Sequence, residues 1–260
     1  MILAKTVNDK LGEMFQFQFV PQTFMSLVVM LIVLIFFLIV GHKARKADIL
    51  EKPKGIFLLG ILFFQFMDNF TGSIMNKKYR DFTRIMIVVA PYLFISFIIS
   101  LTGLPSPVVY LATPLSLALI TFFEVHSTAV RENHWGYFKR YVEPVAVFLP
   151  INLISMWAPT LALTFRLFGN AISGFCIMNI VYYSLETLSN IIFSGQVLTG
   201  AIGVQSIFIA PLVTPLLHLY FDLFSGFIQT LVFSMLTLIY VSQEQSSEDD
   251  SEIIEEVVSN

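Results

Sequence analysis

The chain has 260 residues, of which 56% are hydrophobic and only 13% charged, and its formal net charge is −3. A soluble domain of this length could not bury so much apolar side chain, so lipid must surround much of the chain. The composition therefore excludes an ordinary soluble protein and predicts an all-α integral membrane protein with a single membrane domain, residues 1–260. The one cysteine, Cys176, excludes an internal disulfide.

Five apolar segments match or exceed the roughly 17–25 residues that a membrane-spanning helix needs. In chain order these segments cover residues 24–40, 85–103, 109–130, 157–186 and 207–242. The last two are longer than a perpendicular helix requires, which predicts that they are strongly tilted or lie partly along the membrane. We therefore expect about five transmembrane helices.

The remaining segments are predicted to lie at the membrane surface or in water. Residues 56–70 are apolar but short and contain Gln65 and Asp68, a pattern typical of an interfacial helix. Residues 137–156 begin with charged side chains and contain two prolines, which favours a re-entrant or interfacial segment. Residues 243–260 hold seven acidic and no basic side chains, so we expect a solvated tail.

The distribution of lysine and arginine predicts the orientation of the chain in the membrane. Nine of the 15 basic residues lie within 43–84 and three within 131–140, whereas 190–206 has none. Because basic loops stay in the cytoplasm, the first two regions are predicted to be cytoplasmic and the uncharged one external. With five crossings, residues 1–23 are then external and the acidic C-terminal tail is cytoplasmic.

Arg166 is the one basic residue inside an apolar segment, and no other charged residue lies between Glu143 and Glu186. A guanidinium stays protonated, and at the centre of a bilayer it costs roughly 2.5–3.5 kcal/mol on insertion scales. Such a charge needs a facing partner, so Arg166 is the first candidate functional residue.

Each of the last two membrane segments carries polar residues on one helical face. The spacing i, i+4, i+7, i+8 aligns Arg166, Asn170, Ser173 and Gly174 on the first, and similar spacing aligns His218, Asp222, Ser225, Gly226 and Gln229 on the second. One stripe thus carries a permanent cation, and the other carries a carboxylate and an imidazole. The serines and glycines among them leave room for water.

These stripes have two interpretations. In the structural one, Arg166 and Asp222 neutralise each other and pin the two helices together, although buried ion pairs are not reliable stabilisers. In the functional one, Asp222 and His218 belong to an ion path, because a carboxylate and an imidazole one turn apart can accept and pass protons. Asn170 and Gln229 taken alone could equally be interhelical hydrogen-bonding residues.

The sequence lacks the motifs of several other function classes. It has no P-loop, no glycine-rich dinucleotide turn, no metal-ligand cluster and no Gly-x-Ser-x-Gly elbow. Its basic loops are what the topology already requires, so nucleic-acid binding is not expected. The alternative function is a secondary transporter that uses Arg166 and Asp222, but that class predicts paired repeats or broken helices, and none is evident.

Two segments resemble subunit a of the F-type ATP synthases. The first, Leu163-Thr-Phe-Arg166-Leu-Phe-Gly-Asn170-Ala-Ile-Ser-Gly174, is similar to the family's Arg-Leu-(Phe/Tyr)-Gly-Asn signature. The second, from His218 through Asp222 to Gln229, has the family's spacing of seven between acid and glutamine. The resemblance covers about residues 100–240 and is nearest to low-GC Gram-positive or mollicute sequences.

The resemblance implies a proton-channel stator subunit that is not catalytic by itself and needs no cofactor. Arg166 would face a rotating ring of c subunits, deprotonate the ring carboxylate and separate two offset half-channels. Asn170 and Gln229 would flank it, and Asp222 with His218 would lie in the half-channel open to the outside. Proton flow would drive rotation and ATP synthesis, or run in reverse. The b-subunit peripheral stalk and the rest of the complex would be its other partners, in a bacterial cell membrane.

The chain departs from the family pattern at two places. Many bacterial relatives have a glutamate nine residues after the arginine, where this chain has Phe175. Relatives often carry acids three or four residues after a Pro-x-Asn asparagine, where this chain has Ser155 and Met156. We therefore expect the aspartate and histidine of the last helix to serve proton uptake alone, and Glu143 is a candidate for proton release.

Overall fold

The structure, a computed structural model, describes residues 21–46, 53–75, 82–134, 137, 149–193 and 210–244. The α-helices within these ranges are α2 (Pro21–Lys46), α3 (Ile56–Gly72), α4 (Phe82–Ile98), α5 (Ala112–Asn133), α7 (Leu149–Phe193), α8 (Ala210–His218) and α9 (Ser225–Ser242). Two 3₁₀ turns, η2 (Ile99–Thr102) and η3 (Pro107–Val109), follow α4, and a π-helical segment, η6 (Leu219–Phe224), joins α8 to α9. Every regular element in the described ranges is helical, so the predicted all-α fold is confirmed.

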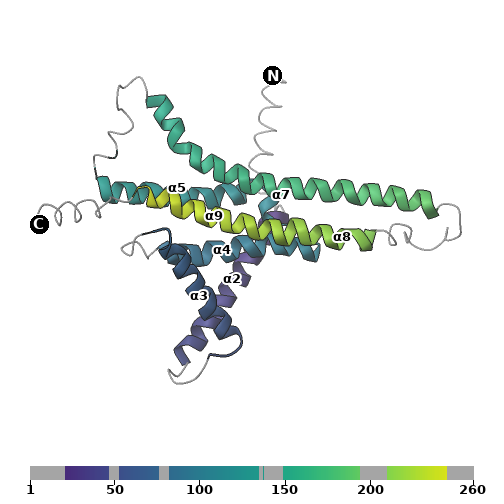
Figure 1. Ribbon diagram of the computed structural model, residues 1–260, viewed down its shortest axis with the longest axis horizontal. Coiled ribbons are helices and arrows are strands. Elements are labelled where there is room, and N and C mark those ends of the chain that lie inside the picture. The colour runs from purple at the N-terminus through teal and green to yellow at the C-terminus, as the bar shows by residue number, and fades with distance from the viewer. Residues whose placement is uncertain are drawn as a thin grey trace, which may run out of the picture.

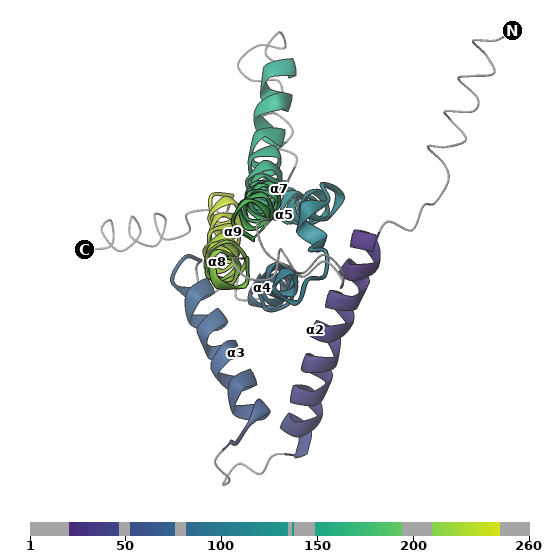
Figure 2. The ribbon, with the colours of Figure 1, turned by 90° about the vertical axis from the view of Figure 1, so that its right-hand side faces the viewer.

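The helices α4, α5, α7 and α9 run side by side along the long axis of the molecule (Figure 1). Viewed along that axis, α2 and α3 extend away from the bundle and approach each other at their far ends, so that they form a V (Figure 2). Helix α4 lies between the two arms at the open end of the V (Figure 2). Helices α7 and α9 contact each other within the bundle. The architecture therefore brings together the two elements that carry the predicted polar stripes.

Among the described residues, four helices are long and apolar enough to cross a membrane: Thr23–Lys46, Phe82–Thr102, Leu149–Leu185 and Val213–Ser242. They correspond to four of the five predicted spans. The fifth, predicted at 109–130, is the helix α5, which has 22 residues but carries Glu124, His126 and Arg131 in its second half. The shorter apolar helix α3 lies where 56–70 was predicted to be helical, and its location at the membrane surface stays a prediction.

Helix α7 has 45 residues and is longer than predicted. We expected a helix over 157–186 after a separate segment over 137–156, and this boundary is wrong because the helix already begins at Leu149. Pro159 weakens the hydrogen-bond ladder without ending it, since proline has no N–H to bond the carbonyl of Ser155. The N-terminal part of α7 bends away from the bundle (Figure 1), as a proline inside a helix explains. Most of the earlier segment lies outside the described residues.

The last predicted helix, 207–242, forms one continuous helical rod over its described part (Figure 1). This rod consists of α8, η6 and α9 and is here named the last rod. Residues Leu219–Phe224 are π-helical, so their turn holds about one residue more than an α-helical turn. The predicted alignment of polar side chains assumed uniform α-helical spacing and therefore did not include this extra residue. The direction of His218 therefore differs from the predicted one relative to α9, which keeps α-helical spacing.

The apolar core lies where α4, α5, α7 and α9 meet. Its buried side chains include Leu93, Phe97, Leu117, Leu163, Leu167 and Phe233. Large apolar side chains also cover the outside of the bundle, such as Phe165 on α7 and Leu216 on α8. An exterior of this kind is compatible with lipid and would expose a large apolar patch to water in a soluble protein.

Gly226 allows α9 to approach α4 closely. A Cβ atom at Gly226 would lie 2.6 Å from the Cβ of Phe97, which is shorter than real Cβ contacts. Phe97 belongs to the buried core, and the closest atom is its Cβ, which can move only with the backbone of α4. Helix packing therefore requires the small residue at this position, as it does at other interfaces between membrane helices.

Replacing Gly226 with alanine is expected to destabilise the protein. The added methyl group overpacks the contact with Phe97, and overpacking costs about 1–3 kcal/mol. The thermal unfolding midpoint of the detergent-solubilised protein measures this loss. Gly41→Ala in α2 is the matched control, because a Cβ at Gly41 meets nothing within 4 Å. Equal midpoints for the two variants would contradict the prediction.

Candidate functional site

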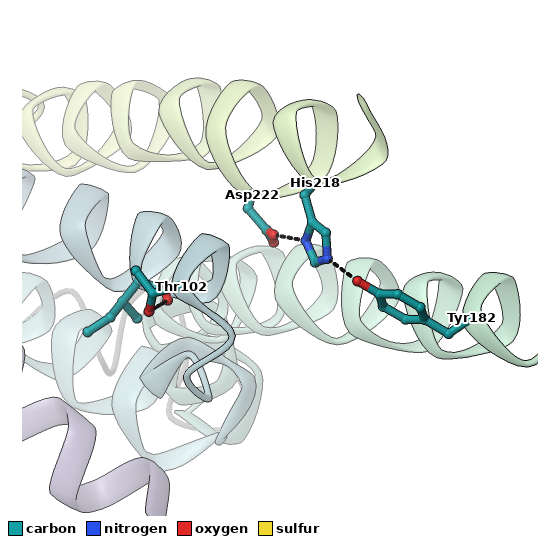
Figure 3. Close-up of polar contacts among 5 residues, drawn as sticks. Thr102, Tyr182, His218 and Asp222 are labelled. Carbon is teal, nitrogen blue, oxygen red and sulfur yellow. Dashed lines mark hydrogen bonds and ion pairs between the residues drawn. The ribbon is translucent and has the colours of Figure 1, made fainter. Parts of the chain in front are cut away.

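Asp222, His218 and Tyr182 form a continuous chain of side-chain hydrogen bonds between α7 and the last rod (Figure 3). Asp222 Oδ2 lies 2.5 Å from His218 Nδ1. The other ring nitrogen, His218 Nε2, lies 2.7 Å from the hydroxyl oxygen of Tyr182. Both nitrogens of the imidazole are thus engaged, one by the predicted carboxylate and one by a tyrosine that the sequence did not indicate.

The irregular segment η6 carries the acidic member of this chain. Asp222 lies within η6, and His218 immediately precedes it. The side chains of Asp222 and His218 are 16% and 24% exposed, so both are shielded without being sealed off. Single π-turns inside α-helices occur frequently at functional sites. The geometry of the rod therefore changes at the point where its titratable groups lie.

Arg166 lies on an exposed face of α7 and not against Asp222. No described acidic residue forms an ion pair with its guanidinium, and Asp222 is hydrogen-bonded to His218. The interpretation in which Arg166 and Asp222 pin the helices together is therefore wrong. The side chain before it, Phe165, is 60% exposed, so a large apolar side chain lies next to the cation.

Asn170 and Ser225 connect the two predicted stripes. The hydroxyl of Ser225 donates to Asn170 Oδ1 across the contact between α7 and the last rod, at 2.7 Å. Gly174 faces the same contact, where an added Cβ would lie 3.7 Å from the Cβ of Phe221. Ser173 does not join the contact, because its hydroxyl donates to the backbone carbonyl of Asn170 in its own helix.

The other predicted site residues have separate environments. Gln229 is buried on α9, and its amide nitrogen has no hydrogen-bond partner among the described residues. An unpaired buried donor costs about 1–3 kcal/mol, so this amide is a local weak point in the packing of α9. Gly226 was expected to leave room for water, but the ring of Phe97 fills that space. Glu143 lies outside the described residues.

A cavity of about 330 Å³, here named the His218 cavity, opens beside the hydrogen-bonded chain. It lies between α7, η6 and the segment that joins η2 to η3. Its polar lining residues are Ser100, Ser106, Asn170, Asn179, Tyr182, His218 and Asp222. A polar space of this size holds several water molecules, each of which occupies about 30 Å³ in the liquid.

A second cavity, of about 220 Å³ and here named the His126 cavity, lies toward the other end of the bundle. Helices α5, α7 and the C-terminal end of α9 form its walls. Its polar lining residues are Thr121, His126, Tyr137, Asn152, Ser155, Thr160, Tyr240, Gln243 and Glu244. His126 Nδ1 lies 2.9 Å from the carbonyl oxygen of Phe122 and must donate to it, so in the neutral ring Nε2 is the accepting nitrogen.

Arg166 lies between the two cavities along α7. The His126 cavity reaches Leu163, about one helical turn before Arg166, and the His218 cavity reaches Asn170, about one turn after it. The two cavities share no lining residue, and Arg166 lines neither of them. A fixed cation thus separates two polar spaces on the same helix.

Sequence reasoning misses two residues of these cavities, Tyr182 and His126. Tyr182 is one of nine tyrosines, and no spacing distinguishes it from the others. Its contact with His218 joins residues 36 positions apart, so it exists only in the folded chain. His126 lies on a helix whose polar end suggested plain exposure to water, whereas the rings of Phe122 and Tyr137 pack against it.

The model of the ATP synthase A chain family matches residues 23–242, which is most of the chain. The chain belongs to this family. ATP synthase subunit a of Mycoplasma genitalium is 30% identical to it over 82% of this chain and 75% of that protein. The sodium-ion-specific ATP synthase subunit a of Propionigenium modestum is 28% identical over 91% of this chain and 78% of that protein. ATP synthase subunit a of a Sulfurihydrogenibium species is 28% identical over 84% and 93%, respectively.

Membership of the ATP synthase A chain family confirms the resemblance that the two motifs carried, including its mollicute character. The family match begins at residue 23, so it also includes α2 and α3, which the motifs did not reach. Together with the apolar helices of the described ranges, this match makes the chain a multi-pass membrane protein. The secondary-transporter alternative has no support.

Replacing Ser225 with alanine removes the hydrogen bond to Asn170 between α7 and the last rod. Stability is expected to fall by about 0.5–1.5 kcal/mol, the net contribution of one hydrogen bond. Ser173→Ala is the matched control, because that hydroxyl bonds the backbone of its own helix. Thermal unfolding in detergent compares the two variants, and a Ser225→Ala midpoint no lower than that of Ser173→Ala would refute this assignment.

Proposed function

We propose that the protein conducts protons through two offset half-channels and exchanges them with a ring of c subunits in an F-type ATP synthase. It would couple the proton gradient to rotation and ATP synthesis, or pump protons when ATP is hydrolysed, without being catalytic itself. The observation that carries the proposal is the position of Arg166, on an exposed apolar face of α7 and between two polar cavities.

The surroundings of Arg166 support an anionic partner on another chain. The exposed side chains near it on α7, including Leu161 and Phe165, are large and apolar. A guanidinium in such a place costs roughly 2.5–3.5 kcal/mol, and no described acidic residue offsets that cost. A carboxylate of a c subunit passing this face would lose its proton beside Arg166, because a nearby fixed cation favours the charged form of an acid.

The His218 cavity supports the uptake half-channel. Asp222 and His218 can accept and pass a proton, since both titrate and are hydrogen-bonded to each other. Asn170 lines the same cavity about one turn from Arg166, which brings the end of this path close to the exposed face of α7. A proton taken up here would be delivered to a ring carboxylate on that side of Arg166.

The His126 cavity supports the release half-channel. In the neutral ring His126 Nε2 can accept a proton, and Glu244 in the same cavity can receive it near the end of the described chain. Thr160 and Leu163 carry the cavity toward Arg166 from the other side. The position of His126 on α5 therefore supports it as the release residue of this proposal, and Glu143 stays a prediction.

Arg166 would prevent protons from crossing directly between the half-channels. A proton has to leave a ring carboxylate on one side of the cation, and another proton has to be taken up on the other side. Each proton that completes its passage across the membrane would release roughly 2.3 kcal/mol per 100 mV of membrane potential. The ring must therefore turn for each proton to complete its passage.

The side chains of the uptake half-channel favour H⁺ over Na⁺ as the coupling ion. Sodium specificity is named for the relative from Propionigenium modestum, so Na⁺ is the second candidate. Sodium prefers a cage of oxygen ligands, whereas here the carboxylate of Asp222 is bonded to an imidazole. A hydrogen-bonded chain of titratable groups is suited to protons.

The distribution of basic loops supports a bacterial cell membrane topology with the N-terminus outside and the C-terminal tail in the cytoplasm. In this orientation the His218 cavity is on the outer side and the His126 cavity is on the cytoplasmic side. The b-subunit peripheral stalk, the rest of the ATP synthase and the lipid bilayer are the remaining partners of the proposal.

Replacing Arg166 with alanine in the complete ATP synthase is expected to abolish proton-driven ATP synthesis while the complex still assembles. The reason is the loss of the cation that discharges the ring carboxylate. Synthesis by reconstituted proteoliposomes under an imposed proton gradient measures the effect. Arg131→Ala at the exposed end of α5 is the matched control and should retain full activity. Unimpaired ATP synthesis by the Arg166→Ala variant would contradict the proposed function.

Replacing His126 with leucine is expected to slow both ATP synthesis and ATP-driven proton pumping. The loss should be about 100-fold, the lower end of the contribution of a positioned proton-transfer group. Quenching of a pH-sensitive dye in proteoliposomes follows pumping. His42→Leu at the exposed end of α2 is the control. Wild-type pumping by the His126 variant would move the release path elsewhere.

A further inference from the structure

We propose that Tyr182 is the outermost member of the proton-uptake relay, which takes protons from water in the His218 cavity and hands its own proton to His218. This role rests on the proposed function and extends it to a residue outside both family motifs. It is carried by the 2.7 Å contact between the Tyr182 hydroxyl and His218 Nε2 (Figure 3) and by the position of Tyr182 in the cavity wall.

The chemistry of the three groups fixes the direction of their hydrogen bonds. An ionised Asp222 can only accept, so His218 Nδ1 carries the hydrogen that lies between them. In a neutral imidazole the other nitrogen is then an acceptor. Tyrosine remains a phenol at neutral pH and can therefore donate its hydrogen to Nε2. The relay runs Tyr182 to His218 to Asp222, with every hydrogen pointing inward.

A proton can pass along this chain without a charged intermediate on Tyr182. A hydronium ion in the cavity gives a proton to the phenol oxygen as the phenol gives its own to His218 Nε2. The Nδ1 proton of His218 then moves to Asp222, and the imidazole is again neutral with its proton on Nε2. Asp222 passes its proton on toward the ring carboxylate and becomes ionised again. Cavity water then takes the Nε2 proton and returns one to Nδ1, and rotation of the phenol hydroxyl restores the starting state. One O–H or N–H bond forms for each that breaks, so no further reactant is needed.

The other walls of the His218 cavity offer no competing proton carrier. The titratable groups that face His218 among the described lining residues are Asp222 on its own rod and Tyr182 on α7. The polar residues from α4 to η3 and from the rest of α7 are hydroxyls and amides: Ser100, Ser106, Asn170 and Asn179. Phe175, two turns before Tyr182, also lines the cavity and has no exchangeable proton.

The next residue in the chain provides a matched control. Tyr183 has the same side chain on the same helix, but it is 73% exposed and does not line the cavity. A change confined to Tyr182 therefore reports its contact with His218 and not the loss of a hydroxyl from α7 in general.

The experiment compares Tyr182→Phe, Tyr183→Phe and Tyr182→His in the complete ATP synthase reconstituted into proteoliposomes. Proton-driven ATP synthesis is measured as a function of the pH on the uptake side. Tyr182→Phe should lower the rate by about two- to tenfold, the equivalent of one hydrogen bond in the transition state. Tyr183→Phe should match the wild type. Tyr182→His should recover most of the rate and gain a new titration between about pH 5 and 8, because imidazole exchanges protons in that range.

Each result has a defined consequence. Wild-type synthesis by Tyr182→Phe at every pH would overturn the role of Tyr182. So would a slowed Tyr182→Phe whose rate Tyr182→His does not restore, since this would indicate packing. In both cases loss of synthesis by Arg166→Ala would leave the proposed function standing. Unimpaired synthesis by Arg166→Ala would instead remove the proposed function, and the role of Tyr182 with it.

Discussion

A permanent positive charge on an apolar helix face is the constraint on which the rest of the molecule depends. Arg166 cannot be neutralised by losing a proton, and no described acidic residue is paired with it. Asp222 could have filled that role, but it is hydrogen-bonded to His218. Because the charge is left at an exposed surface, the proposed function assigns the offset of its desolvation free energy to a carboxylate of a second chain.

The last rod combines a tightly packed part and a loose part. From Gly226 onward it is pressed against α4 and contributes Phe233 to the core, whereas η6 contains no buried residue. The π-turn falls at the change between the two. Tight packing on the C-terminal side holds the rod in place, and the looser side keeps Asp222 and His218 next to a space that water can fill. Neighbouring turns of one element thus fix the position of the rod and give water access to its titratable side chains.

The sequence was sufficient to predict the apolar helices, the exceptional status of Arg166 and the Asp222–His218 pair, since these follow from composition and from i, i+4 spacing. It failed where the outcome depends on contacts between distant residues. The hydrogen bond from Tyr182 joins two helices, and the lack of a bond between Arg166 and Asp222 depends on how α7 is rotated against the last rod. The start of α7 at Leu149 did not follow from the sequence, because prolines usually mark helix ends, whereas Pro150 lies in the first turn of α7, where a missing N–H costs nothing.

The length of α7 explains how one helix can line both cavities and so serve both proposed half-channels. Its first turns line the His126 cavity, its middle carries Arg166 and its later turns line the His218 cavity. Pro159 lies in the wall of the His126 cavity. The first part of α7 turns away from the bundle (Figure 1). Because the cation and both walls belong to a single element, the barrier between the cavities does not depend on the relative position of separate helices. In the proposed function, a proton path through this subunit is therefore interrupted at Arg166, and the moving ring of c subunits would carry the proton from one cavity to the other.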